Sequence, residues 1–133
     1  TLDICMVNTK KLNLIDRIRL FKSDVDNFNY GKYDLIVSNP PYIKKFDLKY
    51  LEKDVYDYEP KSALDGGLDG LLKITKVIYN SSKLIKKNGV LILEIAFNQA
   101  DKVKKILRKN GYYIKDVIKD LANNDRCIVS IKK

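Results

Sequence analysis

The sequence predicts one α/β domain in which a sheet is covered by helices on both faces. The first observation is size, because 133 residues suffice for a single core and not for two. The second is composition, since an apolar share of 45% is typical of a globular chain. The third is pattern, because compact apolar runs alternate with segments of helical spacing. Two of these runs, Tyr33–Val37 and Val90–Ala96, are typical of strands buried on both faces.

The amino-terminal residues predict a helix, a strand, a turn and a second strand. Residues 2–12 form the end of the helix, and apolar residues that alternate with charged ones indicate a short strand over Arg17–Lys22. Residues 23–32 are polar and turn-like. The second strand, Tyr33–Val37, ends at Asn39–Pro41, because proline lacks a backbone N–H and restricts the residue before it.

The rest of the chain predicts a long loop and then alternating helices and strands. Residues 43–68 have no clear period, and a loop of this length inside a compact domain is usually functional. The elements expected after it are a helix over Leu68–Ile85, a turn at Asn88–Gly89, a strand over Val90–Ala96, a helix over Asn98–Lys109 and a closing pair of strands over Tyr112–Ile118 and Cys127–Ile131.

The residue types exclude several classes of site. The chain has no histidine, and its two cysteines, Cys5 and Cys127, lie far apart. A zinc site of the Cys/His type and a histidine-dependent triad are therefore excluded, and we expect no metal. We interpret the thiols as unpaired side chains in a reducing cytoplasm. No run is long enough to span a bilayer, and no signal peptide is recognisable, so we expect no membrane partner.

The charge is unevenly distributed along the chain. The net charge is +9, but residues 22–70 hold 7 basic and 10 acidic side chains, a net of −3. This acidic segment contains the motif to which we assign the chemistry. Because a groove that follows nucleic acid is normally basic, we expect nucleic acid not to be the direct substrate. The basic remainder is interpreted as a solvated, lysine-rich surface.

The motif Asn39-Pro40-Pro41-Tyr42 follows the second predicted strand, where ligands bind in sheets of this kind. It suits methylation of a planar nitrogen, which requires acceptors for both N–H groups of an amide. The Asn39 side chain and the Pro40 backbone each offer a carbonyl oxygen, and proline has no N–H of its own to compete. Pro41 and Tyr42 can stack on a flat group. We therefore predict Asn39 and Pro40 as the catalytic residues.

The chain resembles the HemK-type protein glutamine methyltransferases. The resemblance begins with Asp34–Ile43, and it covers almost the whole chain in several separate motifs. These are Tyr58-Glu59-Pro60-Lys61-Ser62-Ala63-Leu64, Gly67–Leu71, Gly89–Glu94 and Lys119-Asp120-Leu121 with Asn124-Asp125-Arg126. The last of them is similar to the branch that modifies the Gly-Gly-Gln loop of peptide chain release factors. It is less like the branch that acts on a ribosomal protein.

The resemblance implies a substrate and its contacts. The substrate would be a protein glutamine, most specifically in a release factor. Asn39 would contact the substrate amide, and Pro40, Pro41 and Tyr42 would extend the substrate site. Glu59 would order the substrate loop.

The resemblance also implies S-adenosylmethionine as the methyl donor. Asn39 would contact this cofactor, and Asp24, as the acidic residue after the preceding strand, would lie near its adenine. The next position is often aromatic in the family and is Val25 here, which puts stacking on the adenine in doubt. These cofactor assignments depend on the resemblance alone.

The implied fold is the Rossmann-like fold of class I S-adenosylmethionine-dependent methyltransferases, without its amino-terminal strands and Gly-rich loop. In the family these parts lie upstream of the point corresponding to Thr1. Residues 1–133 are therefore expected to be the carboxyl-terminal part of a single catalytic domain, and to be inactive alone.

Two other functions fit parts of the pattern. A methyltransferase acting on the exocyclic amine of adenine or guanine in DNA or RNA would use nearly the same motif, with the base extruded into the pocket. The second alternative is a Rossmann-like binding module without catalysis. The acidic segment and the motifs that follow Tyr42 favour the glutamine methyltransferase over the first alternative, and the intact motif from Asn39 to Tyr42 favours it over the second.

Overall fold

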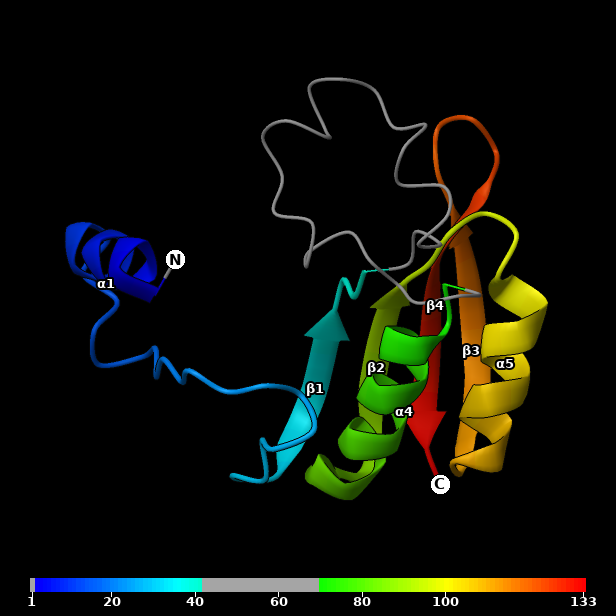
Figure 1. Cartoon of the computed structure of the whole chain (residues 1–133), viewed down its shortest axis with the longest axis horizontal. Coiled ribbons are helices and arrows are strands. Elements are labelled where there is room, and N and C mark those ends of the chain that lie inside the picture. Colours follow the sequence, from blue (N-terminus) through cyan, green and yellow to red (C-terminus); the bar gives the residue numbers. More distant parts are fainter. Residues whose placement is uncertain (1, 42–69) are drawn as a thin grey trace.

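The computed structural model of the chain describes residues 2–41 and 70–133. Figure 1 shows a sheet with two helices packed on it and a further helix beyond its β1 edge. The elements in chain order are α1 (Leu2–Lys11), β1 (Tyr33–Ser38), α4 (Leu72–Leu84), β2 (Ile85–Glu94), α5 (Ala100–Lys109), β3 (Tyr112–Lys119) and β4 (Asp125–Lys132). The loop predicted over residues 43–68, with Tyr42 and Glu59, lies outside the described residues.

The described strands form one mixed sheet in the order β1-β2-β4-β3. β1 and β2 are parallel, and Ser38 at the carboxyl end of β1 pairs with Leu93. β4 is antiparallel to both of its neighbours, so the predicted closing pair of strands is confirmed. Because β1 and β2 are parallel, their carboxyl ends meet at one edge, which we call the carboxyl edge.

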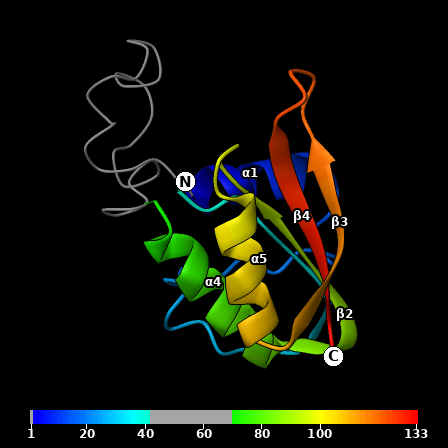
Figure 2. The same cartoon turned by 90° about the vertical axis from the view of Figure 1, so that its right-hand side faces the viewer.

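Both helices that pack on the sheet lie on the same face. α4 contacts β1 and β2, α5 contacts β3 and β4, and the two helices contact each other. Figure 2 shows them next to each other, on one side of β3 and β4. The core between these layers is fully buried and includes Ile74, Ile78, Leu91, Leu93, Val103, Leu107, Tyr112 and Ile128.

The prediction that helices cover both faces holds for one face of the sheet as described. On the other face, Leu35 and Val37 of β1 are 53% and 66% exposed. The sequence pattern marked these side chains as apolar, but it did not indicate which element packs against them.

The strand predicted over Arg17–Lys22 is wrong. The backbone N–H groups of Arg17 and Ile18 instead donate to the Leu14 carbonyl, at 3.0 Å each, within a turn. A strand requires a neighbouring strand to receive its hydrogen bonds, and no described residue provides one here. Alternation of apolar and charged residues describes the side chains and does not supply that partner.

The strand predicted from Val90 begins earlier, at Ile85, and contains an irregularity. Tyr33 pairs with Ile85 and Leu35 with Val90, so β2 has extra residues between these two pairs. The predicted turn lies inside the strand as this irregularity, with Asn88 at a φ of 64°. A Cβ on Gly89 would come within 2.9 Å of the Lys86 carbonyl oxygen. Glycine is therefore required for the close approach of backbone to backbone.

We expect Gly89→Ala to lower the free energy of unfolding by about 1–3 kcal/mol, because the added methyl crowds backbone atoms that cannot move aside easily. Urea unfolding of the 133-residue chain, followed by circular dichroism, measures this. Lys87→Ala is the matched control, since Lys87 lies in the same irregularity and is exposed. Equal stability of the two variants would contradict the crowding.

Candidate functional site

Asn39 and Pro40, which are predicted to be catalytic, and Pro41, a predicted substrate contact, lie at the carboxyl edge immediately after β1. We call these three residues the proposed catalytic segment. Because Ser38 pairs with Leu93, Asn39 is level with Glu94 at the end of β2. Pro40 is buried and Pro41 is half-buried, while Asn39 is exposed. The burial of Pro40 fixes the direction in which the chain leaves the strand. The Asn39 side chain is accessible to a ligand at this edge.

The residues predicted near the adenine, Asp24 and Val25, lie in a turn and not at the end of a strand. The Asp24 carbonyl accepts hydrogen bonds from the N–H groups of Asn27 and Phe28, both at 3.1 Å. Asp24 is exposed, whereas Val25 is partly buried against the core. The turn supplies a backbone fixed by hydrogen bonds, and it carries two exposed carboxylates, Asp24 and Asp26.

Helix α4 holds this turn against the sheet. The Asn80 side-chain amide donates to the carbonyl oxygens of Val25, at 2.6 Å, and Phe28, at 2.7 Å. Lys76 forms an ion pair with Asp26 one turn earlier in the helix. Asn80 is only 9% exposed, so its role is to position the turn. Sequence reasoning missed Asn80, although a polar residue on an otherwise apolar helix face is a recognisable signal.

A cavity of about 690 Å³ lies between this turn, β1 and α4. Its lining includes Val25 from the turn, Val37 and Ser38 from β1, and Asn80 from α4. The cavity follows β1 along its length, and its lining does not include Asn39 or Asp24. Val25 and Ser38, which adjoin Asp24 and Asn39 in the sequence, therefore line one cavity. Asp24 and Asn39 themselves do not line it.

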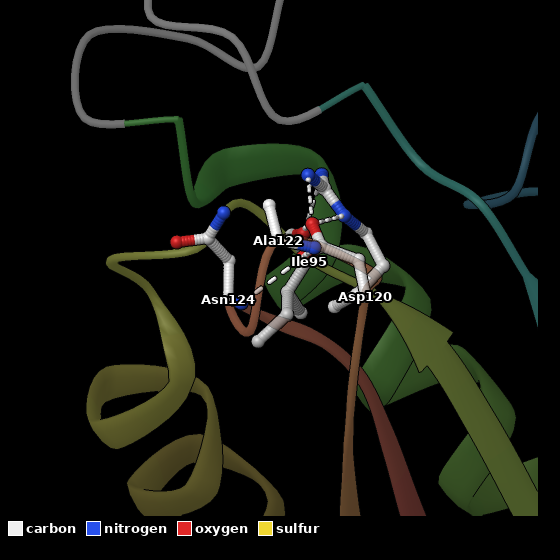
Figure 3. A network of polar contacts seen from close by, with 5 residues as sticks. Ile95, Asp120, Ala122 and Asn124 are labelled. Carbon is white, nitrogen blue, oxygen red and sulfur yellow. Dashed lines mark hydrogen bonds and ion pairs between the residues drawn. The ribbon is translucent and has the colours of Figure 1, made fainter.

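The turn between β3 and β4 forms a dense polar network at the same edge (Figure 3). The Asp120 carboxylate accepts hydrogen bonds from the N–H groups of Ala122, at 2.9 Å, and Asn124, at 3.0 Å. Its second oxygen lies 3.0 Å from Nη2 of Arg126. Arg126 also directs Nη1 to the Ile95 carbonyl at 3.5 Å, and its own carbonyl accepts from the Ile95 N–H at 2.9 Å. The sequence motif marked these residues only through a resemblance, without a role.

Two pKa shifts describe the electrostatics near this edge. Hydrogen bonds from the Asn124 N–H and then from Arg126 lower the pKa of the Asp120 carboxyl. Burial raises the pKa of the Cys127 thiol, and the nearby Glu94 carboxylate acts in the same direction. Both effects disfavour the thiolate, which is the nucleophilic form of cysteine.

The described residues contain neither a metal-binding group nor a membrane-spanning helix. Within residues 2–41 and 70–133, no group of three or more Cys, Asp or Glu side chains is placed to hold a metal ion. None of the described helices is long and apolar enough to cross a bilayer.

The sequence matches known methylases over nearly its whole length. The Eco57I restriction-modification methylase family matches residues 3–128. A release factor glutamine methyltransferase of Clostridium acetobutylicum is 36% identical over 97% of this chain and 46% of its own length. A ribosomal protein uL3 glutamine methyltransferase of Francisella tularensis is 48% identical over 69% of this chain and 29% of its own length. The chain thus spans less than half the length of either relative.

Solved structures agree on the fold. A methyltransferase of Pyrococcus furiosus has a TM-score of 0.66 at 19% identity, covering 98% of this chain and 57% of that one. The N-methyltransferase NodS of Bradyrhizobium japonicum, solved with S-adenosyl-L-homocysteine, has a TM-score of 0.53 at 15% identity, covering 92% and 57%. The predicted Rossmann-like methyltransferase fold is therefore confirmed.

The Asp120 network makes a prediction about pH. Folding lowers the pKa of the Asp120 carboxyl. The ionised carboxylate therefore contributes fully to stability at any pH above its ordinary pKa of about 3.9, and this contribution is lost as the pH falls through the lowered pKa. We expect Asp120→Asn to destabilise the chain at pH 7 and the difference from the unmodified chain to shrink below about pH 4. Urea midpoints between pH 7 and pH 2.5 measure this difference.

Asp125→Asn is the control, because Asp125 lies in the same hairpin and its side chain takes no part in this network. A difference between Asp120→Asn and the unmodified chain that stayed constant over the whole pH range would contradict the assignment.

Proposed function

We propose that this chain, which belongs to the Eco57I-type methylase family, is the carboxyl-terminal part of an enzyme that methylates the side-chain amide of a protein glutamine. The observation that supports this most directly is the placement of Asn39–Pro41. These residues follow a strand at the carboxyl edge, with Pro40 buried and Asn39 exposed. Relatives with glutamine methyltransferase names support this substrate class.

In this proposal, Asn39 and Pro40 orient the substrate nitrogen. An amide nitrogen is a weak nucleophile because its lone pair is delocalised into the carbonyl. The two N–H groups of the substrate amide donate hydrogen bonds to the Asn39 side-chain oxygen and the Pro40 carbonyl oxygen. These bonds fix the nitrogen and increase its electron density. Transfer of the methyl group from S-adenosylmethionine to this nitrogen would release neutral S-adenosylhomocysteine, and the nitrogen would lose one proton to water. A histidine base is not needed.

S-Adenosylmethionine would supply a methyl group on a positively charged sulfur. The residues present fit it, because Asp24 presents a carboxylate on a fixed turn and Val25 lines the adjacent cavity. Asp24 and Val25 would hold the adenine end, and Asn39 would contact the reacting end. Val25, which is partly buried and lines the cavity, would offer van der Waals contact in place of aromatic stacking.

The proposed protein target is a peptide chain release factor in the cytoplasm. The release factor enzyme of Clostridium acetobutylicum matches 97% of this chain, whereas the uL3 enzyme matches 69% at a higher identity of 48%. The carboxyl-terminal Asp120 network lies in the part of the sequence that resembles the release factor branch. Ribosomal protein uL3 is the second candidate, which the same assay tests.

Nucleic acid is the competing substrate class, because the matching family is described as a restriction-modification methylase. The acidic segment argues against it. Residues 22–70 carry a net charge of −3, which repels phosphate groups and attracts a basic protein loop.

A transfer assay tests the substrate class. The assay uses a chimera in which the amino-terminal half of the Clostridium acetobutylicum relative precedes residues 1–133, and we call this chimera the complete enzyme. We expect it to transfer tritium from labelled S-adenosylmethionine to a release factor, and not to DNA or RNA, because the acidic segment excludes phosphates. Replacing the target glutamine by alanine is the control and should abolish labelling. Label found in nucleic acid, or in uL3 alone, would assign the activity to that substrate.

Asn39→Ala in the complete enzyme tests the catalytic role. We expect kcat to fall by about 100-fold or more, because a preorganised acceptor at the reacting centre is lost, while cofactor binding changes less. Single-turnover kinetics and calorimetry separate these two effects. The control is Asn27→Ala, which alters an exposed asparagine in the Asp24 turn. Near-normal turnover of Asn39→Ala would exclude the role.

A further inference from the structure

Two large apolar side chains project from loops at the carboxyl edge. Leu121 lies in the turn between β3 and β4 and is fully exposed, at 110% of the reference area. Phe97 lies in the turn between β2 and α5 and is 63% exposed. We call these two residues the edge pair. Single exposed apolar residues are common on proteins, so the inference depends on how these two are held and where they lie.

The turn that carries Leu121 is fixed by its backbone and by the polar network of Figure 3. The Asp120 N–H donates to the Asn124 carbonyl at 2.8 Å, and the Asn123 N–H donates to the Asp120 carbonyl at 2.9 Å. The Asp120 carboxylate accepts hydrogen bonds from the backbone N–H groups of Ala122 and Asn124. Leu121 is thus presented on an ordered turn, although its side chain contributes no burial to the fold.

The turn that carries Phe97 is fixed in a similar way. The Gln99 side chain, which is 5% exposed, accepts the Ala96 N–H at 3.0 Å and donates to the Gly70 carbonyl at 3.0 Å. The two turns are also joined, because the Ile95 N–H donates to the Arg126 carbonyl and Arg126 reaches the Ile95 carbonyl. The two turns that carry the edge pair are therefore connected by hydrogen bonds.

These two turns lie beside the proposed catalytic segment. Asn39 is level with Glu94, which pairs with Cys127 of β4. Two inter-strand steps of about 4.8 Å, with a further rise into the turn, place Leu121 on the order of 10–15 Å from Asn39. An extended chain covers this distance in about four residues. A protein loop whose glutamine reached Asn39 would bring its flanking residues to the edge pair, whereas a tripeptide would not.

We propose that Phe97 and Leu121 form a contact surface for the protein that presents the glutamine, an inference that rests on the proposed function. Both side chains are uncharged and apolar, and they suit an apolar patch flanking the glutamine loop. The ordered turns lower the entropy cost of contact, because little is left to immobilise on binding. The edge pair therefore recognises the folded substrate, and Asn39 and Pro40 act on its glutamine.

The test uses the complete enzyme with Leu121→Ser, Phe97→Ser and both substitutions together. We expect the KM for a folded release factor to rise about 10-fold for Leu121→Ser and further for the double variant, with kcat unchanged. The kcat/KM for a Gly-Gly-Gln tripeptide should stay within about twofold, because this peptide does not reach the edge pair. Thermal unfolding should be unchanged, since both side chains are exposed.

Tyr79→Ser is the matched control, because Tyr79 is 57% exposed on α4, the helix that packs on β1 and β2. An unchanged KM in the edge-pair variants, an equal rise for Tyr79→Ser, or a parallel loss with the tripeptide would overturn the contact surface. Binding of the release factor, measured by calorimetry, separates this outcome from failure of the proposed function. Leu121-dependent binding without methyl transfer would overturn the proposed function alone, and absence of both would overturn the two together.

Discussion

The parallel pairing of β1 with β2 is the constraint on which the rest of the structure depends. It aligns Ser38 with Leu93, and this register places Asn39 beside the end of β2. A shift by one residue would turn the apolar side chains of β1 to the opposite face. The position of the proposed catalytic segment is therefore set by the same side chains that build the core, since Ile36 packs against that core and Pro40 is buried.

The antiparallel strand β4 extends this arrangement to the other side of the carboxyl edge. It pairs with β2 and brings the hairpin turn after β3 to the edge where β1 and β2 end. Arg126 is hydrogen-bonded to Ile95, so the loops after β2 and β3 are held together. A methyl-transfer site and a surface for a protein partner can thus share one rigid support, as a reaction that depends on positioning requires.

The two dense apolar runs were each predicted to be strands and are strands, although the run over Val90–Ala96 missed both ends of β2, whereas the alternation over Arg17–Lys22 did not make a strand. Tyr33–Val37 was predicted to within one residue of the observed strand. Arg17–Lys22 failed because hydrogen bonding to a neighbour, and not side-chain alternation, makes a strand. Asn88–Gly89 was predicted as a turn and is an irregularity within β2, because a left-handed residue followed by glycine serves either purpose. Local sequence does not distinguish them.

The sequence by itself determined the residue types of the candidate site, because the acceptors and the rigid backbone of the motif from Asn39 to Pro41 are local properties. It also determined the fold class, through the order of apolar runs. Only the tertiary structure decided which residues support that motif. Asn80, Gln99 and Arg126 bond to segments between 29 and 55 positions away. Such partners are chosen by the packing of distant elements, and no pattern of neighbouring residues records them.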